Sequence, residues 1–268
     1  MGHQIQNYMI ENIINLQNVT LAFSKFKGAS PFDHCVVDNF FNPHIADQLS
    51  NEFIPYDDPD WNFYNNLIEN KKACNNWNKF PPLTYKTFYD LNDTPFLNFL
   101  SNLFGEKLYS DPGLHGGGWH CHGTGGLLNP HFDYSIHPKI SLQRILNIIV
   151  YLGKELKEEH GGHLGFWSHK NNQPDQLIQE VEPVFNRAVI FNTAQNSWHG
   201  MSRPLTQPEG IYRKSLAVYY LKEPDIGIDT RGRALFAPTK EQKNNQQIID
   251  LINLRSGVET SKNVYRQK

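Results

Sequence analysis

Cysteine is scarce in this chain, and its scarcity excludes two classes of small domain. The 268 residues include three cysteines, too few for a disulfide framework and too scattered for a zinc ribbon. We therefore expect Cys35, Cys74 and Cys121 to be free thiols in a reducing compartment.

Long apolar runs are also missing. No stretch approaches the roughly 20 apolar residues that a membrane-spanning helix requires. The chain starts without a basic segment followed by an apolar one, so no secretory signal is predicted. These features predict a soluble, cytoplasmic protein with no membrane partner.

Charge of one sign is not in excess either. The chain has 25 basic and 27 acidic residues, so its composition indicates no nucleic-acid partner. What it does contain is apolar and aromatic: 39% hydrophobic residues, with 17 Phe, 12 Tyr and 5 Trp. This composition favours a folded globule with a large core. Because no repeat or linker is visible, one domain over residues 1–268 is predicted.

The first 110 residues are interpreted as a scaffold of helices and strands. Residues 1 to about 30 show no clean period and are expected to form a leading strand or arm. A short strand is predicted within 31–38. Apolar residues at helical spacing predict a helix from about Asn42 to Phe53 and a second one over 94–108.

The pattern changes after about residue 109. Short β-branched and aromatic runs follow one another, separated by Gly, Pro and Asn, with no helical pattern between them. This spacing predicts a sandwich or jelly roll. After residue 222 the chain becomes polar, with a helix expected from about Glu241 to Leu254. The predicted strands are 144–152, 161–167, 188–191 and 215–221.

One further short strand, predicted over 129–134, carries the most specific chemistry. Residues two apart in a strand point to the same face, so His131 and Asp133 should project together. An imidazole and a carboxylate on one face are two of the three ligands of a 2-His-1-carboxylate Fe(II) site.

The third ligand is expected to be a histidine from a distant strand. His199 follows the buried-looking strand 188–192 and is the candidate. His120 and His122 form a competing pair, which could instead build a two-histidine, cupin-like site.

Arg213 is predicted to bind an anion. Arg213 and Ser215 share one face of a strand. A guanidinium is costly to bury unpaired, yet it grips a planar carboxylate through two parallel hydrogen bonds. Tyr151, at the end of the strand 145–152, could supply a hydroxyl to the same anion.

The order of several motifs along the chain resembles that of the Fe(II)/2-oxoglutarate-dependent oxygenase superfamily, and within it the prolyl 4-hydroxylase-like branch. The resemblance implies a mainly β fold with flanking helices, the double-stranded β-helix (jelly roll, cupin-like). It implies a catalytic core at 113–222, a flank at 1–110 and a C-terminal extension at 223–268. The motifs are His131-x-Asp133, Arg144 to Leu152, Gly161-Gly162-x-Leu164, His199 and Arg213 to Tyr220.

The resemblance also implies the cofactors and their ligands. Iron would be held by three residues, with no catalytic residue beyond them: His131, Asp133 and His199. The co-substrate 2-oxoglutarate would be bound by Arg213, Tyr151 and Ser215. Dioxygen is the oxidant, and ascorbate is a further candidate cofactor.

The expected reaction is hydroxylation of a C–H bond, foremost on a prolyl residue of a peptide or protein. His120, Arg144 and Trp167 are candidate substrate contacts. A free amino acid or another small metabolite is the alternative substrate. The non-enzymatic alternative is a jelly-roll module that binds a metal or ligand. A complete triad with a dicarboxylate clamp argues against that module, which has no need of the clamp.

Overall fold

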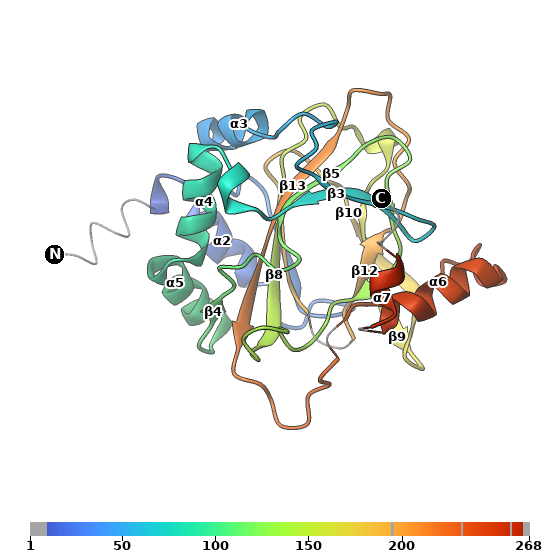
Figure 1. The fold of residues 1–268 in the computed structure, drawn as a ribbon. Coiled ribbons are helices and arrows are strands. Elements are labelled where there is room, and N and C mark those ends of the chain that lie inside the picture. Colours follow the sequence, from blue (N-terminus) through green and yellow to red (C-terminus); the bar gives the residue numbers. More distant parts are fainter. Residues whose placement is uncertain (1–9, 194–195, 232, 258, 265–268) are drawn as a thin grey trace.

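Two curled antiparallel β-sheets lie face to face at the centre of the molecule (Figure 1). This computed structural model describes residues 10–193, 196–231, 233–257 and 259–264. The larger sheet contains β1 (His34–Val37), β2 (Asn62–Asn65), β3 (Glu69–Cys74), β4 (Tyr109–Ser110), β5 (Gly118–His122), β6 (Leu127–Leu128), β8 (Gln143–Tyr151), β11 (Ala188–Asn192) and β13 (Arg213–Lys222). The smaller sheet contains β7 (His131–Phe132), β9 (Leu164–Lys170), β10 (Gln173–Val181), β12 (Trp198–Met201) and β14 (Leu235–Phe236).

The strand order shows how the flanking segments join the core. The larger sheet runs β1-β11-β8-β13-β5-β3-β2, with β4 paired to β13 and β6 to β3. The smaller sheet runs β10-β9-β12-β7-β14. The hairpin β2–β3 from the N-terminal flank therefore extends the larger sheet, and β14 from the C-terminal extension completes the smaller one. The predicted fold class, mainly β with flanking helices around a jelly roll, is confirmed.

Helices cover the outer face of the larger sheet. In Figure 1, α2, α4 and α5 lie on one side of β8 and β13, and α6 and α7 lie on the opposite side of the molecule, near β9 and β12. The helices are α2 (Leu16–Phe23), α3 (Pro43–Asn51), α4 (Pro82–Asn92), α5 (Thr94–Phe104), α6 (Gln246–Ser256) and α7 (Ser261–Val264), with short 3-10 turns η1 (Trp77–Lys79) and η2 (Glu158–His160). No helix in the described residues combines the length and apolar character needed to cross a membrane.

The main core lies between the larger sheet and these helices. Side chains alternate along β8 and β13, and the outward-facing residues in the middle of each strand are buried in the main core: Leu146, Ile148 and Val150 on β8, and Leu216, Val218 and Tyr220 on β13. Those side chains pack with Trp119 and with Phe88 and Phe96 of the helices, all of them fully buried. Because each such side chain stabilises the fold by about 1.5–3 kcal/mol, this layer fixes the position of the sheet. The other face of the sheet is left free to line a cavity.

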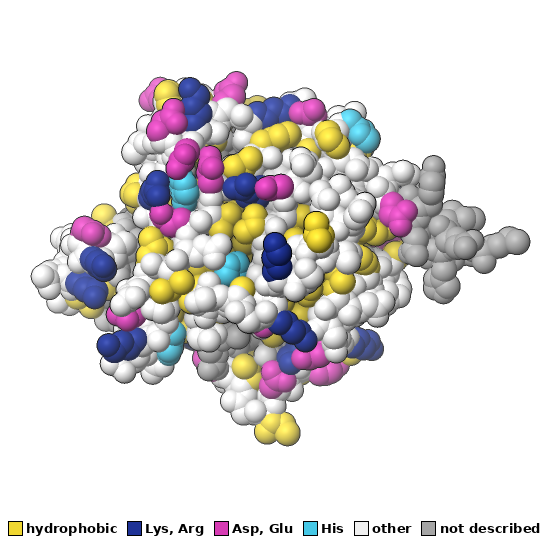
Figure 2. Space-filling view, turned by 180° about the vertical axis from the view of Figure 1, so that it is seen from behind, with side chains coloured by type: hydrophobic (Ala, Val, Ile, Leu, Met, Phe, Trp, Pro, Cys, Tyr) yellow, Lys and Arg dark blue, Asp and Glu magenta, His cyan; other side chains and the backbone are white. Residues whose placement is uncertain are grey.

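Charged side chains of the two signs are mixed on the surface. On the face seen in Figure 2, Lys and Arg side chains are interspersed with Asp and Glu, and no area of one sign dominates. Cys35, Cys74 and Cys121 are buried and free, as the sequence predicts.

Several predicted elements are confirmed, and others are wrong. The strand within 31–38 is β1, and the helices expected from Asn42 and over 94–108 are α3 and α5. Helix α5 ends at Gly105, whose φ of 87° is left-handed. The leading strand or arm expected over 1–30 is wrong at residues 16–23, which form α2; residues 1–9 lie outside the described part.

The errors have local causes. In α2, Val19 and Phe23 are buried one turn apart, and Asn15 caps the helix by accepting a hydrogen bond from the Asn18 N–H at 3.2 Å. Leu21 between them is apolar but 69% exposed, and it obscures this period in the sequence. The strand expected over 129–134 is paired only at His131 and Phe132. Helix α4 and strand β10 were not predicted.

Candidate active site

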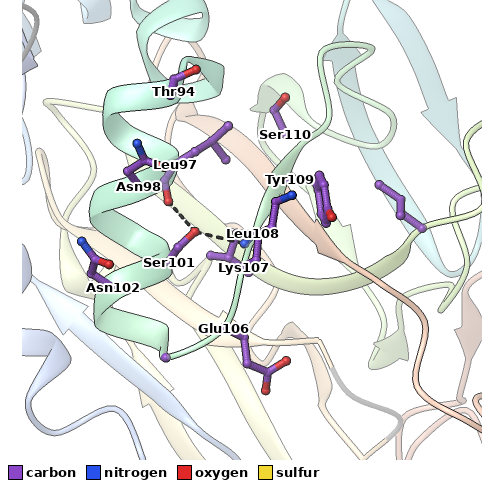
Figure 3. A pocket seen from close by; sticks show the side chains of 12 residues that line it. Thr94, Leu97, Asn98, Ser101, Asn102, Glu106, Lys107, Leu108, Tyr109 and Ser110 are labelled. Atoms are coloured by element: carbon purple, nitrogen blue, oxygen red, sulfur yellow. Dashed lines mark hydrogen bonds between the residues drawn. The ribbon is translucent and has the colours of Figure 1, made fainter. Parts of the chain in front are cut away.

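A large hollow on the surface carries no catalytic chemistry. It has a volume of about 870 Å³ and lies between α5 and the segment 105–110 (Figure 3). The Ser101 hydroxyl donates to the Leu97 carbonyl at 2.6 Å and accepts from the Leu108 N–H at 3.0 Å, so it is occupied by the chain itself. The residues lining this hollow include no histidine and no cysteine. Size alone therefore does not locate the site.

A smaller cavity of about 300 Å³ lies between the inner faces of the two sheets. Its floor is the inner face of the larger sheet, on which residues two apart along each strand point the same way. The smaller sheet and the C-terminal segment form the opposite wall. The floor comprises Asn147 and Ile149 on β8, Arg213, Ser215, Ala217 and Tyr219 on β13, His120 and His122 on β5, and Glu69 and Lys71 on β3.

Three potential metal ligands meet in this cavity. His131 on β7 pairs directly with His199 on β12, and Asp133 follows two residues after His131. One ligand atom from each residue lies within 4.8 Å of the other two, and all three side chains are buried. Among the described residues this is the one such group of three or more His, Cys, Asp or Glu side chains.

The hydrogen bonds of the two histidines leave the correct nitrogen free. His131 Nδ1 donates to the Asn129 carbonyl at 3.0 Å, and His199 Nδ1 donates to the Ser197 carbonyl at 2.9 Å. A carbonyl can only accept, so each proton resides on Nδ1 and each Nε2 presents a lone pair. Asp133 Oδ2 is buried, has no hydrogen-bond partner among the described residues and lies 3.8 Å from His199 Nε2. This set of two imidazoles and one carboxylate fits a divalent cation such as Fe(II).

Burial and neighbouring charges hold these groups in the ligand form. Burial lowers the pKa of His131 to about 3, with His199 contributing, and burial also lowers the pKa of His199. Burial alone would raise the pKa of Asp133. The nearby guanidinium of Arg144 and a hydrogen bond from the Tyr219 hydroxyl help to hold that pKa below its usual value. Both imidazoles are therefore neutral and the carboxylate is ionised.

Arg144 is fixed against the aspartate. Its Nη1 lies 3.5 Å from Asp133 Oδ1, and its guanidinium is stacked between the rings of Tyr134 and Tyr219, 3.7 and 3.4 Å from their centroids. Its Nη2 donates to the Tyr134 hydroxyl and to the His115 carbonyl. Arg144, a predicted substrate contact, does line the cavity, but its Nη1 and Nη2 groups are directed at these protein groups.

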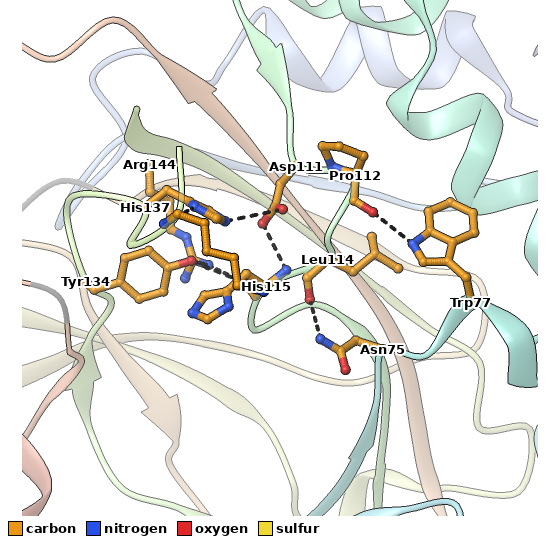
Figure 4. A network of polar contacts seen from close by, with 10 residues as sticks. Asn75, Trp77, Asp111, Pro112, Leu114, His115, Tyr134, His137 and Arg144 are labelled. Carbon is orange, nitrogen blue, oxygen red and sulfur yellow. Dashed lines mark hydrogen bonds and ion pairs between the residues drawn. The ribbon is translucent and has the colours of Figure 1, made fainter. Parts of the chain in front are cut away.

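The loop 111–115 holds the carbonyl that Arg144 binds (Figure 4). Asp111 Oδ2 accepts from the His115 N–H at 3.0 Å, and Asp111 Oδ1 lies 3.4 Å from His137 Nε2. This network holds Arg144 through Nη2, whereas Nη1 faces Asp133. Two more side chains bind carbonyls of the same loop: Asn75 binds Leu114 and Trp77 binds Pro112.

Arg213 is the second group in the cavity with binding capacity that the protein leaves unused. It is 6% exposed, its Nε donates to the Gly162 carbonyl at 2.7 Å and its Nη2 to the Tyr151 hydroxyl at 3.2 Å. It has no acidic partner among the described residues, and burial lowers its pKa. Ser215 lies beside Tyr151 in the sheet register. A buried cation flanked by two hydroxyls is suited to a carboxylate ligand.

The histidines of β5 lie across the cavity from the three ligands. His122 pairs with Arg213 and His120 with Ser215. His122 is 2% exposed, and neither ring nitrogen has a hydrogen-bond partner among the described residues. Burial, with the charges of Lys71 and Arg213, lowers the pKa of His120 to about 3. The rival two-histidine site gains no support, because neither histidine belongs to the group of potential metal ligands.

Trp167, a predicted substrate contact, lies elsewhere. It packs with Phe132 and Trp198, which alternate with His131 and His199 and so face away from the cavity. It does not line the cavity, and this prediction is therefore corrected. On β9, Leu164 lines the cavity. Because residues two apart in a strand share a face, Phe166 also lies on the inner face and Trp167 does not.

Some cavity residues were missed in the sequence. Tyr219 lies two and four residues beyond Ala217 and Ser215, so the strand period could have found it. Phe236 on β14 stacks on His131, with ring centroids 5.1 Å apart and an interplanar angle of 18°. No local pattern could have linked Phe236 to a histidine over 100 residues away along the chain.

Comparisons with known proteins agree with this geometry. Residues 117–221, from β5 to the end of β13, match the family described as the 2OG-Fe(II) oxygenase superfamily. Among curated proteins, none matches the chain by sequence.

Solved structures share the fold at low identity. A Pseudomonas putida prolyl-4-hydroxylase is similar with a TM-score of 0.50 and 15% identity, over 76% of this chain and 100% of that one. A prolyl 4-hydroxylase from Phytophthora capsici gives a TM-score of 0.50 and 18% identity, over 90% of this chain and 76% of that one. HygX from Streptomyces hygroscopicus, solved with nickel, 2-oxoglutarate and hygromycin B, gives 0.48 and 13%, over 76% of this chain and 86% of that one.

The matched segment contains the two histidines, the aspartate and the unpaired arginine that meet in one cavity. This segment, residues 117–221, is the part of the chain that is similar to the 2OG-Fe(II) oxygenase superfamily.

Proposed function

We propose that His131, Asp133 and His199 hold Fe(II) and that Arg213, with Tyr151 and Ser215, binds the far carboxylate of 2-oxoglutarate. One observation supports this most strongly: a buried guanidinium without an acidic partner lies in the same cavity as a complete, unsaturated set of metal ligands. When bound, the iron and 2-oxoglutarate supply the oxidising chemistry by which dioxygen hydroxylates a C–H bond.

The protein contributes position and a dry environment. The carbonyls of Asn129 and Ser197 orient the two imidazoles. Arg144 and Tyr219 hold the aspartate, so one carboxylate oxygen is occupied and the other is left for the metal. Arg213 acts as a clamp and transfers no proton.

We propose a prolyl residue of a peptide or protein as the substrate. The two structures with a TM-score of 0.50 are prolyl 4-hydroxylases, which supports this choice through the shared fold. The hairpin β2–β3, which lines the cavity, also carries two exposed apolar side chains, Phe63 (51% exposed) and Leu67 (49%). These are suited to contact a peptide outside the cavity.

A free amino acid or another small metabolite is the second candidate substrate. Its supporting observation is the cavity itself, which at about 300 Å³ is of the size that holds small molecules. A non-catalytic binding module is the least favoured reading, because it would not need Arg213 beside a complete set of metal ligands.

Calorimetry with Mn(II) and 2-oxoglutarate tests the proposed site. We expect 2-oxoglutarate to bind only when Mn(II) is present. Its affinity for Arg213→Gln should be about tenfold or more below that for wild type, because a charge-assisted bidentate contact is lost. His131→Ala should lose the metal itself. Arg203→Gln is the control, since Arg203 is half exposed and pairs with Glu180 on the surface. Binding of 2-oxoglutarate that needs neither metal nor Arg213 would refute the proposal.

Turnover separates the two substrate classes. Mass spectrometry of candidate peptides should show a gain of one oxygen on proline, coupled to succinate formation and measured with and without ascorbate. If only small molecules couple to consumption of 2-oxoglutarate, the peptide substrate is wrong and the small-molecule one stands.

A further inference from the structure

The cavity carries an excess of positive charge that the proposed cofactors do not neutralise. Five cationic side chains line it, against two carboxylates. The cations are Lys71, Arg144, Arg213, Arg233 and Arg255, and the carboxylates are Glu69 and Asp133. Iron(II) brings two positive charges and 2-oxoglutarate brings two negative ones, so together they leave this excess unchanged. Unpaired charge is costly in a cavity with low dielectric, and such a cavity attracts an anion.

The excess is concentrated away from Arg213, on the side formed by β2, β3 and the C-terminal segment. Lys71 pairs with Tyr64 in the β2–β3 register, and its ammonium lies 5.3 Å from the centre of that ring. Its charge lowers the pKa of all four histidines that face the cavity from the two sheets: His120, His122, His131 and His199. Lys71 therefore faces the same space as the metal ligands.

Glu69 contacts two of these cations. Its carboxylate lies 3.5 Å from Lys71 Nζ and 3.6 Å from Arg255 Nε. One carboxylate is thus shared between two cations. Arg233 adds a third cation, and its charge acts on both Tyr64 and His115.

Arg233 is the most telling of these residues. It lines the cavity and is half-buried, yet it makes no hydrogen bond or ion pair with any described residue. It comes from the C-terminal segment, whereas Lys71 comes from the N-terminal flank. Both lie outside residues 117–221, the part of the chain that matches the superfamily. These two charges therefore lie in the segments that flank the matched core.

We infer that the substrate presents an oxyanion, a carboxylate in the first instance, to Lys71 and Arg233. This inference rests on the proposed function, in which Arg213 is already occupied by 2-oxoglutarate. In a peptide substrate, the carboxylate belongs to an Asp or Glu next to the target proline. In a free amino acid, it is the α-carboxylate.

Matched acids and amides test the inference by direct binding. Protein loaded with Mn(II) and 2-oxoglutarate is titrated with fluorescent proline peptides that differ only by Asp against Asn, or Glu against Gln, before or after the proline. L-Proline against L-prolinamide is the small-molecule arm, followed by calorimetry. We expect the acid of at least one pair to bind about tenfold or more tightly than its amide, because charge-assisted hydrogen bonds are lost in the amide.

Variants locate the effect. The ratio of acid to amide affinity should fall towards one in Lys71→Gln and in Arg233→Gln. It should be retained in Lys170→Gln, which removes an exposed lysine at the end of β9. Added salt should weaken binding of the acid more than binding of the amide.

The outcomes are distinct. Tighter binding of the acid in a peptide pair supports the oxyanion site and a peptide substrate. Tighter binding of the acid only for proline against its amide supports the site and a small-molecule substrate. If Mn(II) and 2-oxoglutarate bind but no acid exceeds its amide, or the ratio survives in both variants, the inference is overturned and the proposed function stands. If 2-oxoglutarate does not bind with Mn(II), the proposed function fails and this inference fails with it.

Discussion

The guanidinium of Arg144 lies 3.5 Å from the carboxylate of Asp133, and both side chains are almost fully buried. The contact engages Oδ1, whereas Oδ2 has no hydrogen-bond partner among the described residues. Arg144 thus decides which carboxylate oxygen is available to a metal. Groups of this kind, which contact a metal ligand and not the metal, tune affinity by fixing orientation and charge.

Replacing Arg144 should therefore weaken metal binding. We expect Arg144→Gln to bind Mn(II) roughly 10- to 100-fold more weakly, because the aspartate loses its fixed rotamer and its compensating charge. The measurement is a Mn(II) titration, with circular dichroism to verify folding and Arg144→Lys as a second variant that keeps the charge. Arg203→Gln, which removes an exposed ion pair, is the control. Unchanged affinity in a folded Arg144→Gln protein would show that Asp133 is positioned without it.

The buried histidines predict that the metal-free protein loses stability in acid. Burial lowers the pKa of His120 to about 3 in the folded protein, whereas an unfolded chain binds the proton near pH 6.5. Between these values the unfolded state carries more protons. The contribution of each such histidine to the free energy of unfolding is thus fully present above about pH 6.5. It falls as the pH drops towards 3, by roughly 1.4 kcal/mol per pH unit.

Thermal melting of the metal-free protein between pH 7 and 4 checks this expectation. His120→Gln should reduce the dependence of the melting temperature on pH, because it removes one group that takes up a proton on unfolding. His44→Gln, at an exposed position on α3, is the matched control. An identical pH dependence in wild type and His120→Gln would contradict the assignment of a neutral imidazole in the folded protein.

Part of the site follows from local pattern, because its residues obey a period of two. His131 and Asp133 were predicted to share a face, as were Arg213 and Ser215, and the structure has each pair lining one cavity. The choice of His199 followed from its place after a buried strand. These inferences need only strand geometry and residue chemistry.

The rest of the site depends on long-range strand pairing, which a single sequence does not encode locally. Lys71 reaches the cavity because β3 pairs with β5, and Phe236 because β14 pairs with β7. Neither pairing has a turn signal to announce it. Trp167 differs for a local reason: it pairs with Trp198, one residue away from the Phe166–His199 pair, so its side chain lies on the opposite face of the smaller sheet.

Gly118 controls the pairing that brings Lys71 to the cavity. Its φ is +90°, and a Cβ atom built on it would lie 2.2 Å from the Cys74 carbonyl oxygen on β3. We expect Gly118→Ala to destabilise the protein by clearly more than the cost of the left-handed conformation alone, about 1–2 kcal/mol. The comparison is Gly125→Ala, where φ is +73° and no atom lies within 4 Å. Denaturant unfolding measures both, and equal losses would show that β3 moves away freely.

Phe236 connects the C-terminal extension to His131, one of the proposed metal ligands. It is 5% exposed, stacks on His131 and packs with Ile68 and Ile248 of a small core. We expect Phe236→Ala to cost about 3 kcal/mol in unfolding free energy, because a buried aromatic ring is lost, and to accelerate amide exchange in β7 and β14. Leu254→Ala, at a position 43% exposed on α6, should change neither. If amide exchange in β7 stays as slow as in wild type, the extension covers the cavity without holding the strand that carries His131.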